Sequence, residues 1–397
     1  MAFARAVRRP IGVFYYSATG RFSSSGNEYS TVASKLENLS HNKSSVLLSG
    51  YTASPVRGFG NFLRSFSSGA PAVSDQMSLI KQLRERTSAP IKDVKASLVE
   101  CNWDLEAAQK DLRKRGKVLA SKKSSRTAAE GMLAVAQNEG KVAVIELNCE
   151  TDFVARNEIF QYLALAMAKH ALLVETSSQQ VSGVFPFGPE LFEEFKLNLD
   201  HPKVSGETTV SNAVTEVAAI MGENVKFRRG FLLSKSSAGV LSAYLHTSPQ
   251  PGLGRIAGIV SLEVEGENTQ LEAIQRVGSE LAMHVVAAKP LFLSKDLVSS
   301  EAIANEREIL KSQAESTGKS QMAIEKIVEG RLRKYFEEVA LMEQKFIVND
   351  AINIKTLVDN LSKEVGSPVK VSNFLRVEVG EGIERLEASD EPLAQTA

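Results

Sequence analysis

Several features that define common protein classes are scarce or missing in this chain of 397 residues. Its two cysteines, Cys101 and Cys149, are too few for a disulfide framework or a thiolate zinc site, and they fit a reducing compartment. No apolar run approaches the roughly 20 residues that a membrane-spanning helix needs. The five histidines are widely scattered, so we expect no metal site and no membrane span.

The usual signatures of an enzyme are also missing. The sequence has no Gly-rich phosphate loop ending in Lys-Ser/Thr, no His-Glu-x-x-His and no nucleophile elbow. The stretch Gly252-Leu253-Gly254 lacks the rest of a dinucleotide-binding fingerprint. We therefore expect no catalytic residues and no cofactor.

The formal net charge is zero, but the charges are unevenly distributed. Residues 1–74 contain eight of the 47 Lys and Arg and two of the 47 Asp and Glu, which leaves 39 bases and 45 acids in the rest. A general nucleic-acid binder is usually more basic than that remainder. At this length the chain is expected to form two or three compact units.

Residues 1–74 have the composition of an organellar leader. They contain fifteen serines, and their arginines alternate with apolar residues, which is typical of a transit peptide. Arg64-Ser65-Phe66-Ser67 and, more weakly, Arg21-Phe22-Ser23 are candidate cleavage sites. We expect a disordered transit peptide that directs the chain to the mitochondrial matrix. A generic disordered tail is the alternative. The choice of mitochondrion over plastid rests on leader composition alone.

Helical spacing begins after the leader and predicts a three-helix module over residues 75–117. Its apolar positions recur at three- and four-residue steps, Pro90 suits a first helical turn, and Gly116 is expected to end the third helix. Asn102 or Asp104 can cap that third helix. The module resembles a ubiquitin-associated domain, which implies partner docking.

A basic linker is expected at residues 118–130, within a charge run that starts at Arg113 and ends at Arg126. Such a run is usually a solvated surface. Nucleic-acid binding is the other interpretation, but no aromatic residue is interleaved to stack on bases.

The remaining pattern predicts an α+β core with antiparallel sheets in two subdomains, residues 131–250 and 251–386. A hairpin is expected at Asn138-Glu139-Gly140. The other expected elements are helices near 159–170, 210–221 and 269–288 and strands near 225–233, 240–246, 256–264 and 371–379. A weak repeat at an offset of 116 residues suggests two similar halves. Residues 300–338 predict a projecting helical hairpin with Gly318 at its bend, and residues 387–397 a disordered tail.

One segment ends a strand and opens a helix: Asn148-Cys149-Glu150 followed by Thr151-Asp152-Phe153-Val154. With it, the sequence closely resembles the elongation factor Ts family, whose hallmark is Thr-Asp-Phe-Val. Five further stretches resemble that family in the same order over about 310 residues: Leu83-Arg84-Glu85-Arg86-Thr87, Gly222-Glu223-Asn224 with Arg228-Arg229, Ala282-Met283-His284-Val285 with Lys289-Pro290, Val328-Glu329-Gly330-Arg331, and Val379-Gly380-Glu381-Gly382-Ile383-Glu384.

The resemblance implies a guanine nucleotide exchange factor that binds elongation factor Tu in its GDP-bound and nucleotide-free forms. In the family, the aspartate and phenylalanine press near the partner's second switch and disturb the magnesium and phosphate-loop contacts of GDP. Carried over, Phe153 is a wedge, Asp152 its polar anchor, and Thr151 and Val154 their neighbours. Leu83, Arg84 and Thr87 are implied to contact the nucleotide-binding face, Met221 and Gly222 to extend the core contact, and His246 to hold another domain of the partner.

Other interpretations of the same residues exist. Asp152 can simply cap a helix while Phe153 packs inward, Met221 can be helix core, and His246 can be an ordinary strand-end residue. A ubiquitin- or RNA-binding adaptor would use only the helical module and the basic linker. Two stretches depart from the family pattern: the turn Ser88-Ala89-Pro90, and residues 177–205, which are hard to match to compact relatives.

Overall fold

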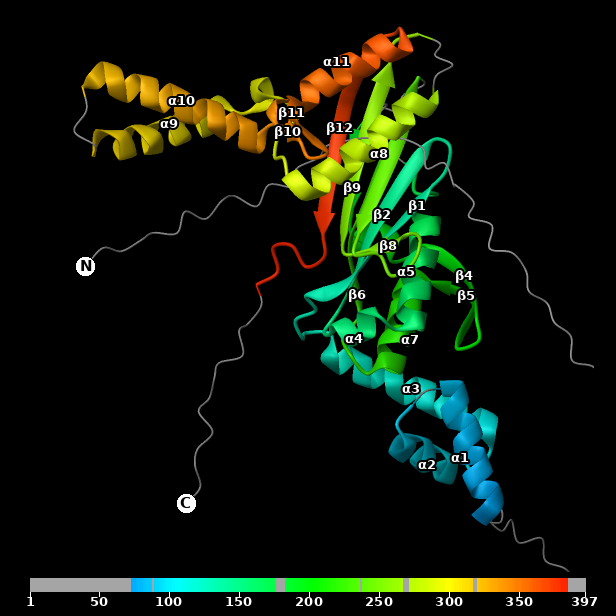
Figure 1. Cartoon of the computed structure of the whole chain (residues 1–397). Coiled ribbons are helices and arrows are strands. Elements are labelled where there is room, and N and C mark those ends of the chain that lie inside the picture. The colour runs from blue at the N-terminus through cyan, green and yellow to red at the C-terminus, as the bar shows by residue number, and fades with distance from the viewer. Residues whose placement is uncertain are drawn as a thin grey trace, which may run out of the picture.

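The computed structural model describes residues 73–87, 89–175, 183–235, 238–266, 271–316 and 320–384. Residues 1–72 of the expected transit peptide, the acidic tail and Gly318 lie outside these ranges. The predicted boundary at residue 74 is too late, because Val73 and Ser74 are already helical. The fold is α+β, as predicted: a helical module at one end, two antiparallel sheets in the middle and a projecting helical hairpin (Figure 1). Among the described residues, every helix is too short or too polar to span a bilayer.

The module consists of α1 (Val73–Thr87), α2 (Ile91–Glu100) and α3 (Leu105–Lys123). Its small core is formed by Leu83, Val94, Leu98 and Ala108, each fully buried. Asp104 is the residue that caps α3, because its side chain accepts hydrogen bonds from the backbone N–H groups of the first helical turn at 2.9 and 3.0 Å. Pro90 precedes the first residue of α2, at the cap position.

The prediction that Gly116 ends the third helix is wrong. α3 continues to Lys123 and packs its second half against α7 (Val210–Met221). At Gly116 a Cβ atom would lie only 2.9 Å from the Cβ of Ala219, so the glycine permits close approach of the two helices. Arg113 forms an ion pair with Glu216 of α7 at 2.5 Å. The first six residues of the expected basic linker, 118–123, are therefore helix, and this part of α3 joins the module to the core.

The first sheet has the strand order β3-β6-β2-β1-β8. Asn138 forms the predicted turn between β1 and β2, because its Oδ1 accepts hydrogen bonds from the N–H groups of Gly140 and Lys141 at 3.0 and 2.8 Å. α5 (Glu158–Ala171) covers one face of the sheet. The strands are β1 (Glu130–Gln137), β2 (Lys141–Cys149), β3 (Gly183–Phe187), β6 (Lys226–Ser234) and β8 (Leu253–Gly254).

The segment that departs from the family pattern has a structural role in its described part, residues 183–205. It adds β3 to the edge of the first sheet, then forms α6 (Pro189–Phe192) and the separate pair β4 (Lys196–His201) and β5 (Val204–Thr209). The rings of Phe187 and Phe192 lie 5.3 Å apart, and both are buried in the first core. This segment therefore extends the core of the first subdomain.

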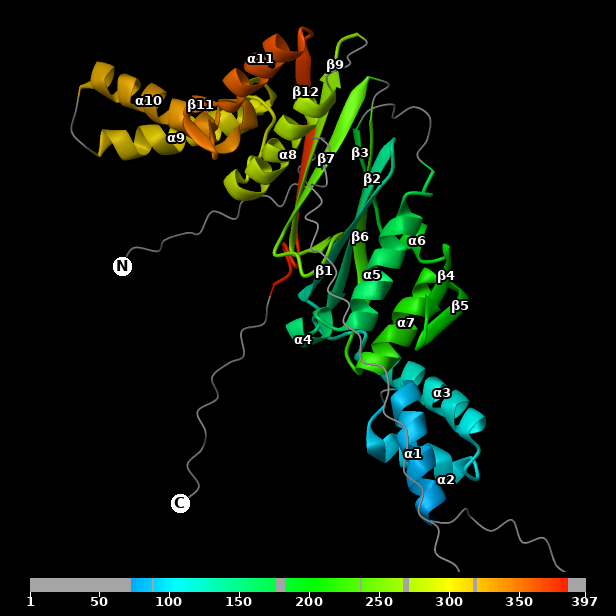
Figure 2. The same ribbon diagram turned by 45° about the vertical axis from the view of Figure 1, so that its right-hand side comes forward.

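The second sheet has the order β12-β9-β7 and packs face to face with the first. α8 (Leu271–Ala288) covers its outer face, which gives four layers: helix, sheet, sheet, helix (Figure 2). The strands are β7 (Gly239–His246), β9 (Ile256–Val264) and β12 (Val369–Glu378). The projecting hairpin is α9 (Ser300–Glu315) and α10 (Gln321–Val339), and the rest comprises η1 (Lys295–Leu297), η2 (Leu341–Glu343), β10 (Lys345–Phe346), β11 (Asn349–Asn353) and α11 (Ile354–Val365).

The two halves repeat one order of elements. An outer strand, a central strand, a covering helix, a second helix and a third strand occur as β1-β2-α5-α7-β6 and again as β7-β9-α8-α11-β12. Both second helices end on a glycine in the left-handed region, Gly222 at φ 71° and Gly366 at φ 69°. The weak sequence repeat thus has a structural counterpart, with the hairpin inserted in the second half.

Candidate partner-binding site

The Thr-Asp-Phe-Val segment forms a single helical turn, α4 (Asp152–Ala155), at the end of β2. Thr151 is its N-cap: the residue is extended, and its hydroxyl accepts a hydrogen bond from the N–H of Val154 at 3.4 Å. α5 begins separately after its own cap, Asn157. The segment therefore opens a short turn before the long helix, and not the long helix itself.

Phe153 is the most exposed large apolar residue that the structure describes, with 78% of its surface accessible. Val154 faces the other way and is 8% exposed, within the first core. Asp152 forms an ion pair with Arg156 one turn later, at 2.6 Å. The prediction that Phe153 stands outward is confirmed, and the inward alternative is excluded.

A carboxylate from another element fixes the start of this turn. Glu223 accepts two hydrogen bonds from Thr151, one from its backbone N–H at 3.0 Å and one from its hydroxyl at 2.7 Å. Hydrogen bonds to an ionised acceptor are the stronger kind, about 1.5–3 kcal/mol each. Phe153 thus lies two residues after Thr151, which Glu223 holds to the loop after α7.

The neighbouring residues Glu150 and Asn224 form a reciprocal contact, in which the carboxylate comes from the end of β2 and the N–H from the loop after α7. Glu150 accepts a hydrogen bond from the backbone N–H of Asn224 at 2.6 Å and forms an ion pair with Arg126 at 3.2 Å. The side chain of Asn224 donates to the carbonyl oxygens of Ser124 and Arg126. Glu150, Thr151, Glu223 and Asn224, here called the loop clamp, join the end of β2, the end of α7 and the end of α3.

Met221 and Gly222 immediately precede the loop clamp. Met221 is partly buried against the first core, whereas Gly222 is exposed and has φ 71°, a conformation that L side chains rarely adopt. The Lys123 ammonium donates to the Gly222 carbonyl. The structure thus brings both predicted residues to the same loop as Thr151.

Cys149 lies directly behind the site and is fully buried. Burial raises the pKa of its thiol to about 12, and the negative charges of Glu223 and Glu130 add to that effect. The protonated thiol donates to the Thr151 carbonyl at 3.1 Å. It is therefore a packing residue and not a nucleophile.

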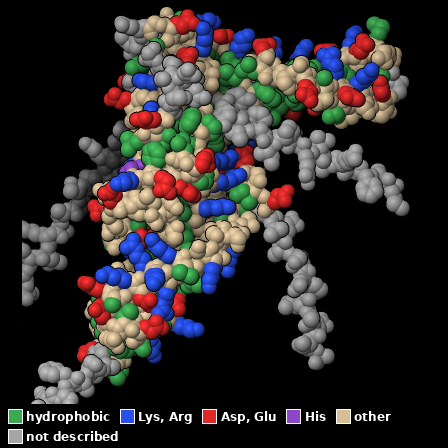
Figure 3. Space-filling view, turned by 180° about the vertical axis from the view of Figure 1, so that it is seen from behind, with side chains coloured by type: hydrophobic (Ala, Val, Ile, Leu, Met, Phe, Trp, Pro, Cys, Tyr) green, Lys and Arg blue, Asp and Glu red, His purple; other side chains and the backbone are tan. Residues whose placement is uncertain are grey.

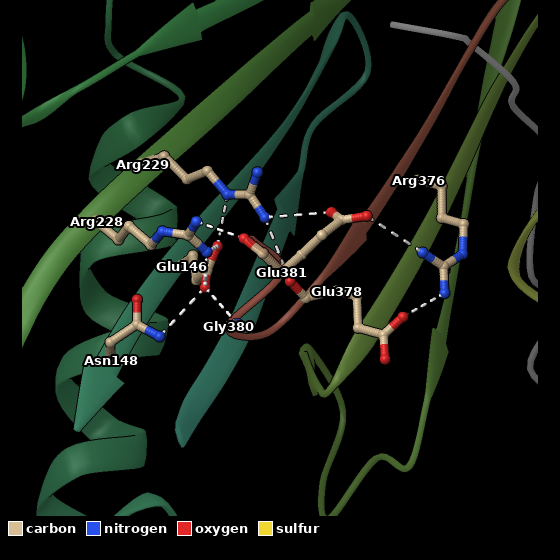
Figure 4. Close-up of polar contacts among 8 residues, drawn as sticks. All are labelled: Glu146, Asn148, Arg228, Arg229, Arg376, Glu378, Gly380 and Glu381. Atoms are coloured by element: carbon tan, nitrogen blue, oxygen red, sulfur yellow. Dashed lines mark hydrogen bonds and ion pairs between the residues drawn. The ribbon is translucent and has the colours of Figure 1, made fainter. Parts of the chain in front are cut away.

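A buried carboxylate, that of Glu146, anchors β2 three residues before Cys149 (Figure 4). The side chain of Glu146 is fully buried and accepts hydrogen bonds from Arg228 at 2.9 Å and from Arg229 at 2.6 Å. It also accepts a hydrogen bond at 2.8 Å from the backbone N–H of Gly380, which follows the end of β12. Two of the family-like stretches, Arg228-Arg229 and Gly380-Glu381, therefore meet here and join the two subdomains.

The other predicted contact residues lie in different places. Leu83 is fully buried in the module, so its side chain has no surface for a partner. Arg84 is exposed, and the hydroxyl of Thr87 donates to the Leu83 carbonyl at 2.7 Å. His246 is exposed at the end of β7, on the second sheet, where its Nδ1 lies 3.3 Å from the Tyr244 hydroxyl oxygen.

Sequence reasoning assigned no role to Glu146, Glu150 or Glu223. For Glu146 a signal was present, because a lone acid in the apolar strand Val142–Cys149 indicates a buried, paired charge. Glu150 and Glu223 belong to the family-like stretches at 148–154 and 222–224, but only the fold shows that each carboxylate contacts the other's loop.

The arrangement provides an exposed apolar side chain on a firmly held turn. Within the described ranges, no set of three or more His, Cys, Asp or Glu side chains is placed to hold a metal ion. An exposed aromatic on a rigid support is typical of an interface hot spot.

Comparison with known proteins gives the family of this chain. A family model described as "Elongation factor TS" matches residues 150–381. The chain is similar to "Elongation factor Ts, mitochondrial" of Arabidopsis thaliana, 94% identical over 398 residues and all of both chains, and of Ricinus communis, 67% identical over all of both chains. It is 41% identical to "Elongation factor Ts" of Paramagnetospirillum magneticum, over 79% of this chain and 93% of that one. The match covers the loop clamp, α4 and both subdomains, so the chain belongs to the elongation factor Ts family.

Proposed function

We propose that this protein is a guanine nucleotide exchange factor for elongation factor Tu in mitochondrial translation elongation. Family membership supports the general role. The observation that carries the specific role is Phe153, 78% exposed on a turn whose first residue is held by Glu223. Burying such a side chain in a partner gains apolar contact without loss of contacts in the free protein.

Phe153 acts as a wedge on the GDP-bound partner. It enters near the second switch of the GTPase domain, and Asp152 provides a polar anchor beside it. The inserted ring disturbs the magnesium and phosphate-loop contacts that hold GDP. The loop clamp ties this turn to β2, α7 and the end of α3, so the turn itself is rigid. On insertion, the partner's groups are therefore displaced and Phe153 keeps its position.

Exchange follows from thermodynamic linkage. A protein that weakens GDP binding is itself bound more weakly by the GDP form, to the same degree. Each tenfold weakening corresponds to about 1.4 kcal/mol of coupling. No covalent step, catalytic residue or cofactor is required. The same coupling applies to GTP, so the nucleotide pool sets the direction of exchange.

The remaining contacts are assigned around this wedge. Arg84 and Thr87 of the module meet the nucleotide-binding face, and Met221 and Gly222 extend the contact beside α4. His246, at the end of β7, contacts another domain of the partner. Leu83 supports the module from its core, since its side chain is buried.

The mitochondrial matrix is the proposed location. The leader composition supports it, and so do the printed names of the Arabidopsis thaliana and Ricinus communis relatives, which include the word mitochondrial.

Release of labelled GDP from mitochondrial elongation factor Tu tests the function. Adding this protein is expected to speed release at substoichiometric amounts, and the protein alone is expected to consume no nucleotide. Release at the unstimulated rate, with the partner shown to be active by its GTP binding, would overturn the proposal.

A further inference from the structure

The outer face of α3 carries a charge pattern that the fold does not explain. Residues 75–130 contain 13 Lys and Arg against eight Asp and Glu, whereas residues 131–397 contain 26 against 37. Residues 113–126 alone have seven bases and no acid. Like charges this close on a helix repel each other and lower its stability. Figure 3 shows basic side chains gathered where the module meets the core.

Four of these seven bases have partners within the chain. Arg113 pairs with Glu216, Arg115 with Asp111 and Glu100, and Arg126 with Glu150. Lys123 donates to the Gly222 carbonyl. Arg113, Lys123 and Arg126 stabilise the junction between module and core, whereas Arg115 stabilises the module itself.

The other three are lysines on the opposite side of the helix, where Lys110, one turn before Lys114, joins them. At about 100° per residue, Lys110, Lys114, Lys117 and Lys122 lie within an arc of roughly 140° that is centred opposite Gly116, Ala120 and Lys123, which face the core. Asp111 also falls within this arc, where its carboxylate is paired with Arg115. Lys110, Lys117 and Lys122 form no hydrogen bond or ion pair with any described residue, and Lys114 acts on Asp111 only through its charge. These four residues are here called the lysine face.

The lysine face has an apolar centre. Val118 lies in the middle of the arc and is 52% exposed. No aromatic side chain in α3 accompanies the lysines to stack on nucleotide bases. A basic face around an exposed aliphatic side chain fits an acidic protein surface better than a nucleic acid.

We propose that the lysine face is an electrostatic docking surface for an acidic patch on the GTPase partner. This inference rests on the proposed function and adds to it a means of rapid association. α3 reaches the loop clamp at its C-terminal end through Asn224 and Arg126, so a partner guided along the lysine face arrives beside Phe153. Steering of this kind raises the association rate and depends on ionic strength.

Stopped-flow association of the full chain with labelled, GDP-bound elongation factor Tu tests the surface. The variant combines Lys114→Gln, Lys117→Gln and Lys122→Gln. The matched control removes the same charge elsewhere with Lys326→Gln, Lys355→Gln and Lys363→Gln, all exposed on α10 and α11. At low salt the variant is expected to associate about tenfold more slowly and to show a weaker salt dependence, whereas the control changes less than about twofold. Dissociation and GDP release at saturation are expected to stay unchanged.

The outcomes are distinguishable. Equal association rates in the variant and the control would overturn the lysine face and leave the exchange function intact. Absence of any complex with the unaltered chain would overturn both proposals. Binding of a single-stranded RNA oligomer at physiological salt that the three substitutions abolish, with normal association to the GTPase, would assign the face to nucleic acid and also overturn the proposal.

Discussion

Glu223 holds Thr151 by two hydrogen bonds, at 3.0 Å from the backbone N–H and 2.7 Å from the hydroxyl. The residues are 72 positions apart in the sequence. Thr151 in turn caps the helical turn that presents Phe153. The orientation of the most exposed apolar side chain described thus depends on a carboxylate from another loop.

Breaking this contact is expected to impair exchange as well as stability. Thr151→Val removes the hydroxyl, and Glu223→Ala removes the carboxylate that accepts from it. We expect the two changes to be coupled by about 1.5–3 kcal/mol in the free energy of unfolding, because each removes the same hydrogen bond. Urea denaturation of both single variants and the double variant measures this coupling. Additive effects would show that the contact contributes nothing.

The two glycines Gly222 and Gly330 are expected to respond to alanine in opposite ways. Gly222→Ala places a side chain at φ 71°, which costs roughly 1–2 kcal/mol. Gly330 lies inside α10, with open space where a Cβ atom would be, so Gly330→Ala is expected to stabilise the protein by about 0.5–1 kcal/mol. Thermal unfolding of both variants checks the pair, and equal shifts in Tm would contradict the assigned backbone conformations.

Glu146→Gln is expected to destabilise the protein by roughly 3 kcal/mol, because it leaves Arg228 and Arg229 without their buried countercharge. The matched control is Glu364→Gln, whose ion pair with Arg276 is about half exposed on both sides and contributes at most about 1 kcal/mol. Chemical denaturation compares the two. Equal losses would mean that Glu146 does not join the subdomains.

Acid is expected to weaken the second subdomain through His284. Burial lowers the pKa of this histidine. The neutral ring fits its contacts, with Nε2 3.0 Å from Gln344 Oε1 and Nδ1 accepting from the Ile347 N–H at 3.3 Å. The unfolded chain binds a proton near pH 6.5, where the folded chain does not. Stability contributed by His284 is therefore present above about pH 6.5, falls as the pH drops through that value, and levels off below the lowered pKa.

Unfolding midpoints between pH 7.5 and pH 5 test this sign. The variant His284→Gln should show a smaller loss with acid than the unaltered chain, although it is less stable at neutral pH. His170→Gln, in the last turn of α5 and outside the second subdomain, serves as the matched control for the loss of a histidine. The same slope in all three proteins would exclude His284 as its source.

Local sequence was sufficient for much of the fold. The expected helix at 210–221 and strand at 256–264 agree with α7 and β9 to the residue, because apolar periodicity and turn residues are local signals. The role of Gly116 could not be predicted locally, because the glycine is required by close packing against Ala219, about a hundred residues away in the sequence. Glu223 carries no local signal, because its partner Thr151 comes from another loop. Glu146, a lone acid in an apolar strand, indicates a buried pair, but its partners Arg228 and Arg229 are visible only in the fold. Position 153 was placed correctly, but what braces it was not visible in the sequence.

GDP release from elongation factor Tu with Phe153→Ala measures the central claim most directly. Leu173→Ala is the matched control, since Leu173 is also largely exposed, at 67%, but lies beyond α5. Phe153→Ala should leave the unfolding free energy unchanged and weaken binding to the nucleotide-free partner by at least about 2 kcal/mol, roughly 30-fold, with slower GDP release at limiting concentrations. Leu173→Ala should behave like the unaltered protein. Unchanged stimulation by Phe153→Ala would contradict the wedge.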